Sequence, residues 1–152
     1  MKIQSLGHVV LKVRDQARAE AFYGDLLGLP IVARFADYNM TFFSLGNHHD
    51  FAVMAVGDDA PAPSEQATGL LHVAFKIGDS LDELRAARDH LTAAGIEARP
   101  IDHGVTQSLY FHDPDGNEIE VYVDASDAWR ENPELVARAD SMWPAPIEWS
   151  TV

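Results

Sequence analysis

The feature that most constrains this chain is an internal repeat. Leu6-Gly-His-Val-Val-Leu-Lys-Val-Arg-Asp15 aligns with Leu70-Leu-His-Val-Ala-Phe-Lys-Ile-Gly-Asp79, and Leu, His, Val, Lys and Asp are identical in register. Both segments alternate in the way that a strand does. Self-similarity of this kind predicts that one supersecondary unit is present twice in the fold.

The two copies also continue in the same order. A helical pattern follows each first strand, at 17–27 before Gly28 and at 80–94 before Gly95, and glycine suits the left-handed position that ends a helix. Three short strand-like runs come next in each copy, at 31–35, 40–45 and 51–56 in the first and at 97–101, 107–112 and 118–123 in the second. The predicted order is therefore βαβββ, twice.

The domain organisation follows from this repeat. We expect a first βαβββ repeat at residues 1–56, a linker rich in Pro, Gly and acids at 57–69, and a second repeat at 70–124. A tail at 125–152 contains a short helix predicted to begin at Pro133, because proline suits the first helical position. Tails of this kind pack over a site or against a second subunit.

Composition excludes several function classes. The 11 basic and 24 acidic side chains give a net charge of -13, which disfavours nucleic acid and anionic membranes as partners. The chain has no cysteine, so any metal must be held by His, Asp or Glu. Neither a signal-peptide pattern nor a run of about 18 apolar residues is present. A soluble cytoplasmic protein is the expectation.

Three residues are candidates for metal binding. An isolated strand histidine is more often a structural residue than a ligand, but His8 and His72 fall at the same position of equivalent strands, so the repeat makes them a pair. In the last strand, Glu118, Glu120 and Tyr122 share one face. An acid flanked by Ile and Val in mid-strand is costly to bury unless it is paired or bound to a cation. Glu120 is therefore a better ligand candidate than Glu118, which lies beside the predicted turn 113–116.

At this point the chain resembles a known family. The repeat, the first-strand histidines and the segment Leu109-Tyr-Phe-His-Asp-Pro-Asp-Gly-Asn-Glu-Ile-Glu120 are similar to the vicinal oxygen chelate superfamily. That superfamily includes glyoxalase I, fosfomycin-resistance transferases and extradiol ring-cleavage dioxygenases, and the resemblance covers residues 3–124. It implies an α+β fold in which two βαβββ repeats form a curved mixed sheet around a metal site, with His8, His72 and Glu120 as the ligands.

The number of ligands helps to distinguish the chemistries of the superfamily. The resemblance implies a fourth, acidic ligand in the last strand of the first repeat of glyoxalases, yet this strand reads Phe51-Ala-Val-Met-Ala-Val56. Matching Gly46-Asn47 to Gly116-Asn117 instead places Asp50 opposite Glu120, so Asp50 stays open as a fourth ligand. Two histidines and one carboxylate leave about three octahedral positions free, which suits non-heme Fe(II) with substrate and O2.

The remaining site residues also come from the resemblance. In similar ring-cleavage dioxygenases a His-His or His-Asp pair begins the strand that here follows Gly46-Asn-His-His-Asp-Phe51, and one histidine of the pair acts as acid and base. That role falls on His49, whereas strand alternation predicts that His48 points to the opposite face as a surface residue. The pattern from Ile101 to Glu120 fits the extradiol signature, with Tyr110 expected to hydrogen-bond the substrate and His103 to shape the pocket.

The resemblance thus implies an Fe(II)-dependent extradiol catechol dioxygenase, an oxidoreductase of aromatic catabolism whose partners are a small aromatic diol and O2. Mn(II), Zn(II) and Ni(II) are alternative metals. The alternative functions are a glyoxalase-like lyase or fosfomycin-resistance-type transferase with another divalent metal, and a protein that sequesters a planar drug. The complete ligand set argues against the last, because bleomycin-binding relatives generally lack the ligands. Two-repeat chains of this family usually pair, so a homodimer is expected.

Overall fold

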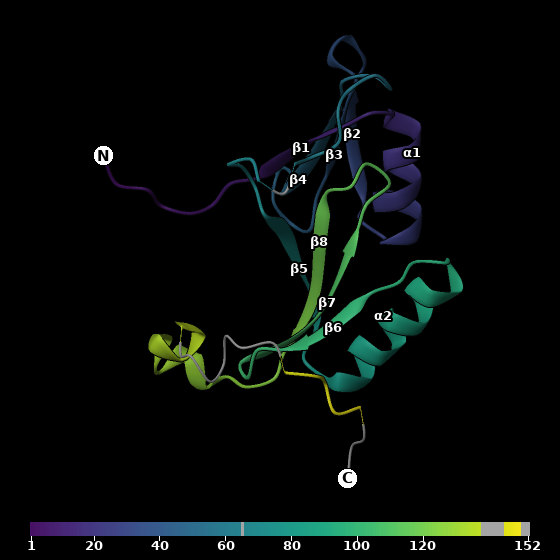
Figure 1. The fold of residues 1–152 in the computed structure, drawn as a ribbon. Helices are drawn as coiled ribbons and strands as arrows, with labels where there is room; N and C mark the ends of the chain where they lie inside the picture. Colours follow the sequence, from purple (N-terminus) through teal and green to yellow (C-terminus); the bar gives the residue numbers. More distant parts are fainter. Residues whose placement is uncertain (65, 138–144, 150–152) are drawn as a thin grey trace. The chain divides into compact units, whose positions relative to one another are not determined.

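The computed structural model of the chain describes residues 1–64, 66–137 and 145–149, and it divides them into two compact units. Unit 1 comprises Met1–Ala67 together with the turn Asp113–Gly116, and unit 2 comprises Thr68–His112 and the chain from Asn117 onward. Each unit holds one four-stranded mixed sheet and its own helix (Figure 1). The predicted fold class, α+β with two βαβββ repeats, is confirmed.

Unit 1 follows the predicted order of elements. Its helical segment begins as α1 (Gln16–Glu20) and continues as the π-helical η1 (Ala21–Leu26), before Gly28 takes a positive φ of 76°. The sheet has the strand order β1-β4-β3-β2, with β1 and β4 parallel and the other pairs antiparallel. The strands are β1 (Val9–Val13), β2 (Ile31–Phe35), β3 (Met40–Phe43) and β4 (Phe51–Ala55), and a short 3-10 turn, η2 (Ala36–Tyr38), joins β2 to β3.

Unit 2 repeats this plan. The strand order is β5-β8-β7-β6, again with one parallel pair, β5 with β8. The helix α2 (Leu81–Ala93) packs across β5, β7 and β8 (Figure 1). The strands are β5 (His72–Gly78), β6 (Arg99–Asp102), β7 (Thr106–His112) and β8 (Glu118–Asp124).

Local signals in the sequence account for where the helices begin. The Ser80 hydroxyl accepts a hydrogen bond from the Glu83 amide, and the Glu83 carboxylate accepts one from the amide of Asp79, just before the N-cap, in a variant of the capping box. At the start of α1, the Asp15 carboxylate accepts a hydrogen bond from the Arg18 amide at 2.7 Å. In each repeat the aspartate that ends the repeated first segment therefore lies at a helix N-terminus.

Strand alternation separates the two faces of each sheet. In β8, Ile119, Val121 and Val123 are buried on the face that carries apolar side chains. Glu118, Glu120 and Tyr122 lie on the other face, as predicted from their spacing, and Glu120 is only 7% exposed. A carboxylate this deeply buried requires a partner, because an unpaired buried charge is costly. The core of unit 1 includes Val13, Tyr23, Phe43, Phe51 and Val53, and the core of unit 2 includes Leu84, Leu91, Leu109, Phe111 and Ile119.

The C-terminal tail follows β8 within unit 2. It forms two 3-10 turns, η3 (Ala128–Arg130) and η4 (Pro133–Ala137), so the segment that begins at Pro133 is a 3-10 turn over its described residues. The rest of the predicted helix, up to residue 140, and the extended segment expected at Trp143 lie outside the described residues. Within the part of the chain that the structure describes, no helix is long and apolar enough to cross a membrane.

Candidate functional site

The registers of the two sheets show which residues of the repeats correspond. Val9 pairs with Phe51 in unit 1, and its counterpart Val73 pairs with Ile119 in unit 2. One step along the strands, Val10 pairs with Ala52 in unit 1, whereas Ala74 pairs with Glu120 in unit 2. Ala52 is therefore the counterpart of Glu120, and it offers no ligand to a metal.

Asp50, which the sequence left open as a fourth ligand, corresponds to Glu118 in this register. Its carboxylate accepts hydrogen bonds from the backbone amides of Leu45, at 2.6 Å, and Asn47, at 3.4 Å. Ser44 closes the same turn by donating its hydroxyl proton to the Asn47 carbonyl. Asp50 thus stabilises the turn before β4, and the alignment that placed it opposite Glu120 is wrong.

His72 and Glu120 come together in unit 2. His72 Nε2 lies 3.1 Å from Glu120 Oε2 across the parallel pair β5 and β8, and His72 Nδ1 is buried without a hydrogen-bond partner among the described residues. Two ligands that each lie about 2.1 Å from one metal ion, at a right angle, are about 3.0 Å apart. The observed spacing therefore suits two donors to one octahedral ion.

Tyr110 and His103 extend this pair into a network. The Tyr110 hydroxyl and His103 Nε2 are hydrogen-bonded at 3.0 Å, and the Tyr110 ring lies edge-on to His72 with centroids 5.5 Å apart. Burial raises the pKa of Tyr110, and the negative charge of Glu120 and a hydrogen bond to that carboxylate raise it further. Tyr110 therefore stays protonated near neutral pH, as a donor held beside the candidate ligands.

A cavity of about 340 Å³ opens beside Glu120 in unit 2. Its lining combines residues from β5, β7, β8 and the loop before β7 with two from the tail: Ala74, Val105, Thr106, Glu120, Tyr122, Asp124, Trp129 and Val136. A concave, largely apolar space beside a buried carboxylate is where a small molecule is expected to bind. The tail residues of this wall had no signal in the repeat pattern, since the first repeat has no counterpart of the tail.

Three histidines gather in unit 1. The rings of His8 and His49 lie 4.2 Å apart between centroids, and those of His48 and His49 lie 4.5 Å apart. His48 Nδ1 is 2.7 Å from His49 Nδ1, and Phe42 lies edge-on to His49 at 5.1 Å. Partial burial and the neighbouring imidazoles of His8 and His48 lower the pKa of His49. His48 is exposed, as predicted for a surface residue, but its ring does not point away from that of His49, because both residues precede β4 and strand alternation does not apply to them.

The structure therefore divides the predicted site residues between the units. His72, Glu120, Tyr110 and His103 form one network in unit 2, whereas His8 and His49 are neighbours in unit 1. Among the residues that the structure describes, no three acidic or imidazole side chains are grouped as a complete metal site. The three-ligand set therefore stays a prediction.

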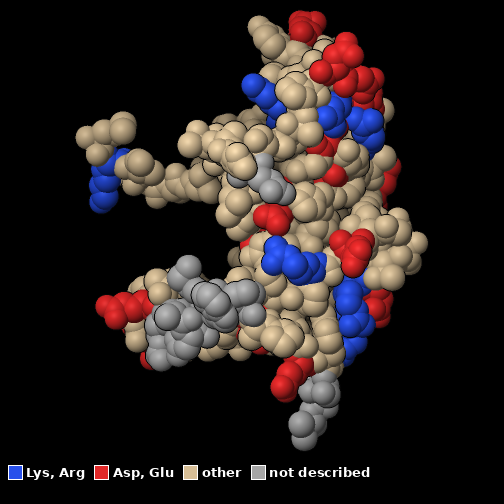
Figure 2. Space-filling view, viewed as in Figure 1, with Lys and Arg blue, Asp and Glu red and all other residues tan. Residues whose placement is uncertain are grey.

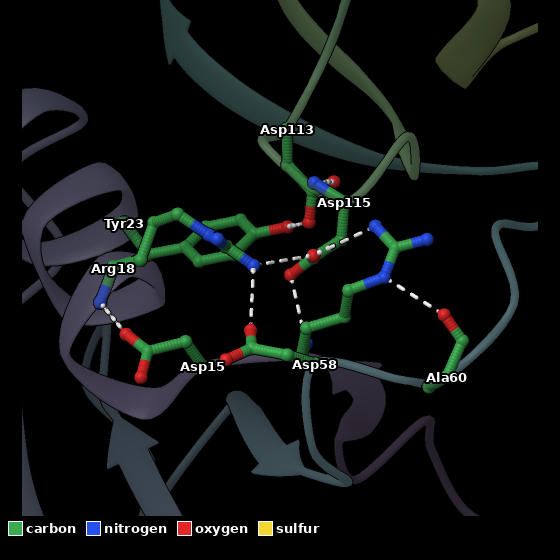
Figure 3. Close-up of polar contacts among 8 residues, drawn as sticks. Asp15, Arg18, Tyr23, Asp58, Ala60, Asp113 and Asp115 are labelled. Atoms are coloured by element: carbon green, nitrogen blue, oxygen red, sulfur yellow. Dashed lines mark hydrogen bonds and ion pairs between the residues drawn. The ribbon is translucent and has the colours of Figure 1, made fainter.

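The turn Asp113–Gly116 is bound by residues of α1, η1 and the loop after β1 (Figure 3). The Asp115 carboxylate, 6% exposed, accepts hydrogen bonds from the Arg14 amide at 2.9 Å, from the Arg14 guanidinium at 3.2 Å and from Arg18 at 2.9 Å. Tyr23 donates its hydroxyl proton to Asp113 at 2.7 Å, and Gly116 supplies the positive φ of 90° that closes the turn. The spacing of the sequence predicted this turn but not its partners.

The charged surface agrees with the composition. On the face drawn in Figure 2, acidic side chains are interspersed with Lys and Arg, and the described residues of this face form no continuous basic patch. In unit 1 the polar cavity of about 660 Å³ beside α1 is lined by Arg14 and Arg34, but Arg34 is held by Glu20 and Arg14 by Asp115. These cations are therefore already neutralised.

A two-repeat α+β fold, with a histidine at the head of each first strand and a buried glutamate on the last strand, defines the class of protein to which this chain belongs. Residues 5–121 match the family model described as the Glyoxalase/Bleomycin resistance protein/Dioxygenase superfamily. The chain is a member of that superfamily, and the resemblance stated from its sequence is confirmed.

Known proteins of several activities are similar to this chain. Biphenyl-2,3-diol 1,2-dioxygenase 3 of Rhodococcus globerulus is 36% identical over 125 residues, which cover 78% of this chain but only 63% of the dioxygenase. Lactoylglutathione lyase of Salmonella typhimurium is 27% identical over 128 residues, which cover 81% of this chain and 94% of the lyase. The crystal structure of a glyoxalase/dioxygenase from Nostoc punctiforme superposes with a TM-score of 0.67 at 22% identity, covering 81% of this chain and 92% of the other. That last likeness shows the fold alone.

Proposed function

We propose that this protein is an Fe(II)-dependent extradiol dioxygenase that cleaves the ring of a catechol-type aromatic diol with O2. The observation that carries the proposal is the pairing of His72 with Glu120 at 3.1 Å, together with Ala52 at the position that corresponds to Glu120. His8, His72 and Glu120 then make two histidines and one carboxylate, the ligand set typical of non-heme Fe(II) oxygenases.

The third ligand is the part of this proposal that requires unit 1. His8 heads β1 as His72 heads β5, and its ring is exposed beside His49. The resemblance implies His8 as this third ligand. His8, His72 and Glu120 would hold Fe(II), and the metal would supply Lewis acidity toward the diol and a path for electrons to O2.

The surrounding side chains have separate tasks in this proposal. His49 accepts a proton from a diol hydroxyl and later returns one to the reacting oxygen, and its lowered pKa favours the neutral imidazole that a base requires. Its Nδ1 is engaged with His48, so Nε2 is the nitrogen that exchanges this proton. Tyr110, protonated at neutral pH, donates a hydrogen bond to a substrate oxygen, and His103 orients the Tyr110 hydroxyl.

The test is anaerobic loading with Fe(II), followed by exposure to a panel of catechols in air. We expect O2 uptake and a yellow ring-fission product in which the carbon-carbon bond beside the two hydroxyls is broken and both atoms of O2 are retained. The absence of both signals with every catechol would refute the proposal.

A lyase of the glyoxalase kind is the second candidate, and the match that covers 94% of lactoylglutathione lyase favours it. This activity would use a hemithioacetal and a metal such as Zn(II) or Ni(II). Turnover of a hemithioacetal without O2 uptake would select it over the dioxygenase. The alanine at position 52 argues against it, because the resemblance implies an acidic ligand in that strand of glyoxalases.

A further inference from the structure

Two residues of the C-terminal tail, Trp129 and Val136, form part of the wall of the cavity beside Glu120. We propose that they determine substrate specificity, and that the cavity selects an uncharged aromatic diol with an apolar ring substituent over a diol that carries a carboxylate. This inference rests on the proposed function, since it takes the cavity beside Glu120 as the place where the ring of the diol lies.

The tail is attached to unit 2 on both sides of these residues. Before them, the Ala125 amide donates a hydrogen bond to the Val105 carbonyl at 2.9 Å. After them, the Asp102 amide donates to the Ala145 carbonyl at 2.9 Å, and Ile147 is buried at 5% exposure. The Arg88 guanidinium lies over the Trp149 ring at 4.3 Å. With anchors at both ends, Trp129 and Val136 are part of the fold of this unit.

The indole of Trp129 is held in place by its neighbour. The Arg130 guanidinium lies over the Trp129 ring at 4.6 Å and is itself bonded to Asp127 at 2.8 Å. Arg130 does not line the cavity. Its guanidinium stacks on the Trp129 ring and forms an ion pair with Asp127. A flat, apolar ring beside the cavity favours contact with a second aromatic ring.

The charges around the cavity disfavour an anionic ligand. The described residues that line it include two carboxylates, Glu120 and Asp124, and neither Lys nor Arg. Lys76, the cation bonded to the lining residue Asp124 at 2.7 Å, is also bonded to Asp79, and these bonds raise its pKa. A carboxylated diol would lose its hydration in this cavity without a free cation among the described lining residues to pair with it, and that loss is costly. An uncharged substituent would instead gain from the apolar wall formed by Ala74, Val105 and the two tail residues.

The experiment measures binding, under nitrogen and with Fe(II)-loaded protein, by isothermal titration calorimetry. The probes are biphenyl-2,3-diol, catechol and 3,4-dihydroxybenzoate. We expect wild type to bind biphenyl-2,3-diol at least about tenfold more tightly than 3,4-dihydroxybenzoate. Trp129→Ala should weaken the binding of biphenyl-2,3-diol about tenfold and that of catechol, which lacks the second ring, much less. Tyr38→Ala removes an exposed aromatic ring of unit 1 that does not line the cavity, and it should leave these ratios unchanged.

A second pair of variants tests the inference independently if Trp129→Ala does not fold. Val136 is 55% exposed, so lysine fits there without loss of core packing. Val136→Lys should shift the preference toward 3,4-dihydroxybenzoate by about tenfold, whereas Ala137→Lys adds the same charge one residue away from the lining and should not.

Each outcome bears on the inference. Unchanged ratios in both Trp129→Ala and Val136→Lys, equal or tighter binding of the carboxylated diol by wild type, or no binding of any diol would overturn it. Because binding is measured without O2, the inference and the proposed function fail separately. Selective binding without turnover in air would refute the dioxygenase and support the specificity assigned to the cavity.

Discussion

The two repeats of this molecule share one backbone plan and differ in the residues that the plan places on equivalent positions. In unit 2, Tyr110 pairs with Glu120 across β7 and β8. In unit 1, Phe42 pairs with Ala52 across β3 and β4. A phenol and a carboxylate on one sheet thus correspond to a phenyl ring and a methyl group on the other. The histidines at the heads of β1 and β5 are the polar element that both repeats keep.

The turns that precede β4 and β8 also differ between the two repeats. The turn at 44–50 satisfies its own polar groups through Ser44, Asn47 and Asp50. The turn Asp113–Gly116 binds side chains of unit 1 instead, although both strands that flank it belong to unit 2. The turn at 44–50 is therefore stabilised by its own residues, whereas the turn Asp113–Gly116 depends on residues far from it in the sequence.

The largest expected effect comes from giving unit 2 the residue that unit 1 already has. Glu120→Ala reproduces Ala52 at the equivalent position and removes the carboxylate that lies 3.1 Å from His72. Loss of a group that only orients a metal ligand lowers metal affinity about 10–100-fold, and loss of a ligand itself should lower it more. We therefore expect the affinity for Fe(II) to fall by more than about 100-fold. Metal content after dialysis and catechol turnover measure the change.

The matched control for this variant is Glu118→Ala. Glu118 lies on the same face of β8 and is near the surface beside Arg99, at 3.5 Å. Its removal should leave the iron content near that of wild type. Equal loss of iron from both variants would mean that the face of β8, and not Glu120 itself, holds the metal.

His49→Ala tests the part that unit 1 plays in the chemistry. Proton transfer by a positioned side chain contributes about 10²–10⁴-fold to a rate, so turnover should fall by that factor while the iron content is retained. His48→Ala removes only the ring that is bonded to His49 Nδ1, and it should cost less. If His49→Ala loses iron as Glu120→Ala does, His49 is a ligand and the assignment of His8 is wrong.

The sequence predicted the features that follow from the alternation of apolar side chains and from the internal repeat. The bounds of β2 were predicted as residues 31–35 and are observed there, and the alternation along β8 placed Glu120 on the face that also carries His72. The first strands are shorter than the segments that repeat in the sequence, since β1 begins at Val9 and β5 at His72. The sequence segment that repeats is therefore longer than the hydrogen-bonded strand within it.

What the sequence could not predict depends on contacts between distant residues. Arg14 and Asp115 are 101 residues apart, and nothing in the spacing of either motif pairs them. His48 was misplaced because it lies in a turn whose backbone does not alternate. The tail has no counterpart in the first repeat, so the repeat could not place Trp129 beside Glu120.

Asp115→Asn tests the turn that unit 1 holds. The variant keeps the shape of the side chain and removes the charge that faces Arg14 and Arg18, which are partly exposed. Breaking a buried ion pair costs about 3–5 kcal/mol, and the exposure of the arginines reduces this to about 2 kcal/mol of unfolding free energy. Urea denaturation measures it. Asp58→Asn, an exposed acid 3.9 Å from Arg18, is the control and should change stability by less than about 0.5 kcal/mol.

Tyr23→Phe makes the smallest change to the same turn, because it removes one hydroxyl and keeps the ring that packs 4.8 Å from Phe51. Near neutral pH we expect a loss of about 1–2 kcal/mol, since the buried Asp113 carboxylate loses the donor that lies 2.7 Å away. The pH dependence identifies the cause. Burial, and then the negative charge of Asp113, raise the pKa of Tyr23 far above its value of about 10 in the unfolded chain.

As pH rises above about 10, the unfolded state releases the Tyr23 proton while the folded state retains it, so the stability of wild type declines by up to about 1.4 kcal/mol per pH unit from this group. Tyr23→Phe lacks this contribution, and the difference between the two proteins should therefore shrink as pH increases from 9 toward 11. Denaturant titrations at several pH values measure it. If the two proteins lose stability in parallel above pH 10, the Tyr23 hydroxyl is not the buried donor to Asp113, and the turn is held by Asp115 and its arginines alone.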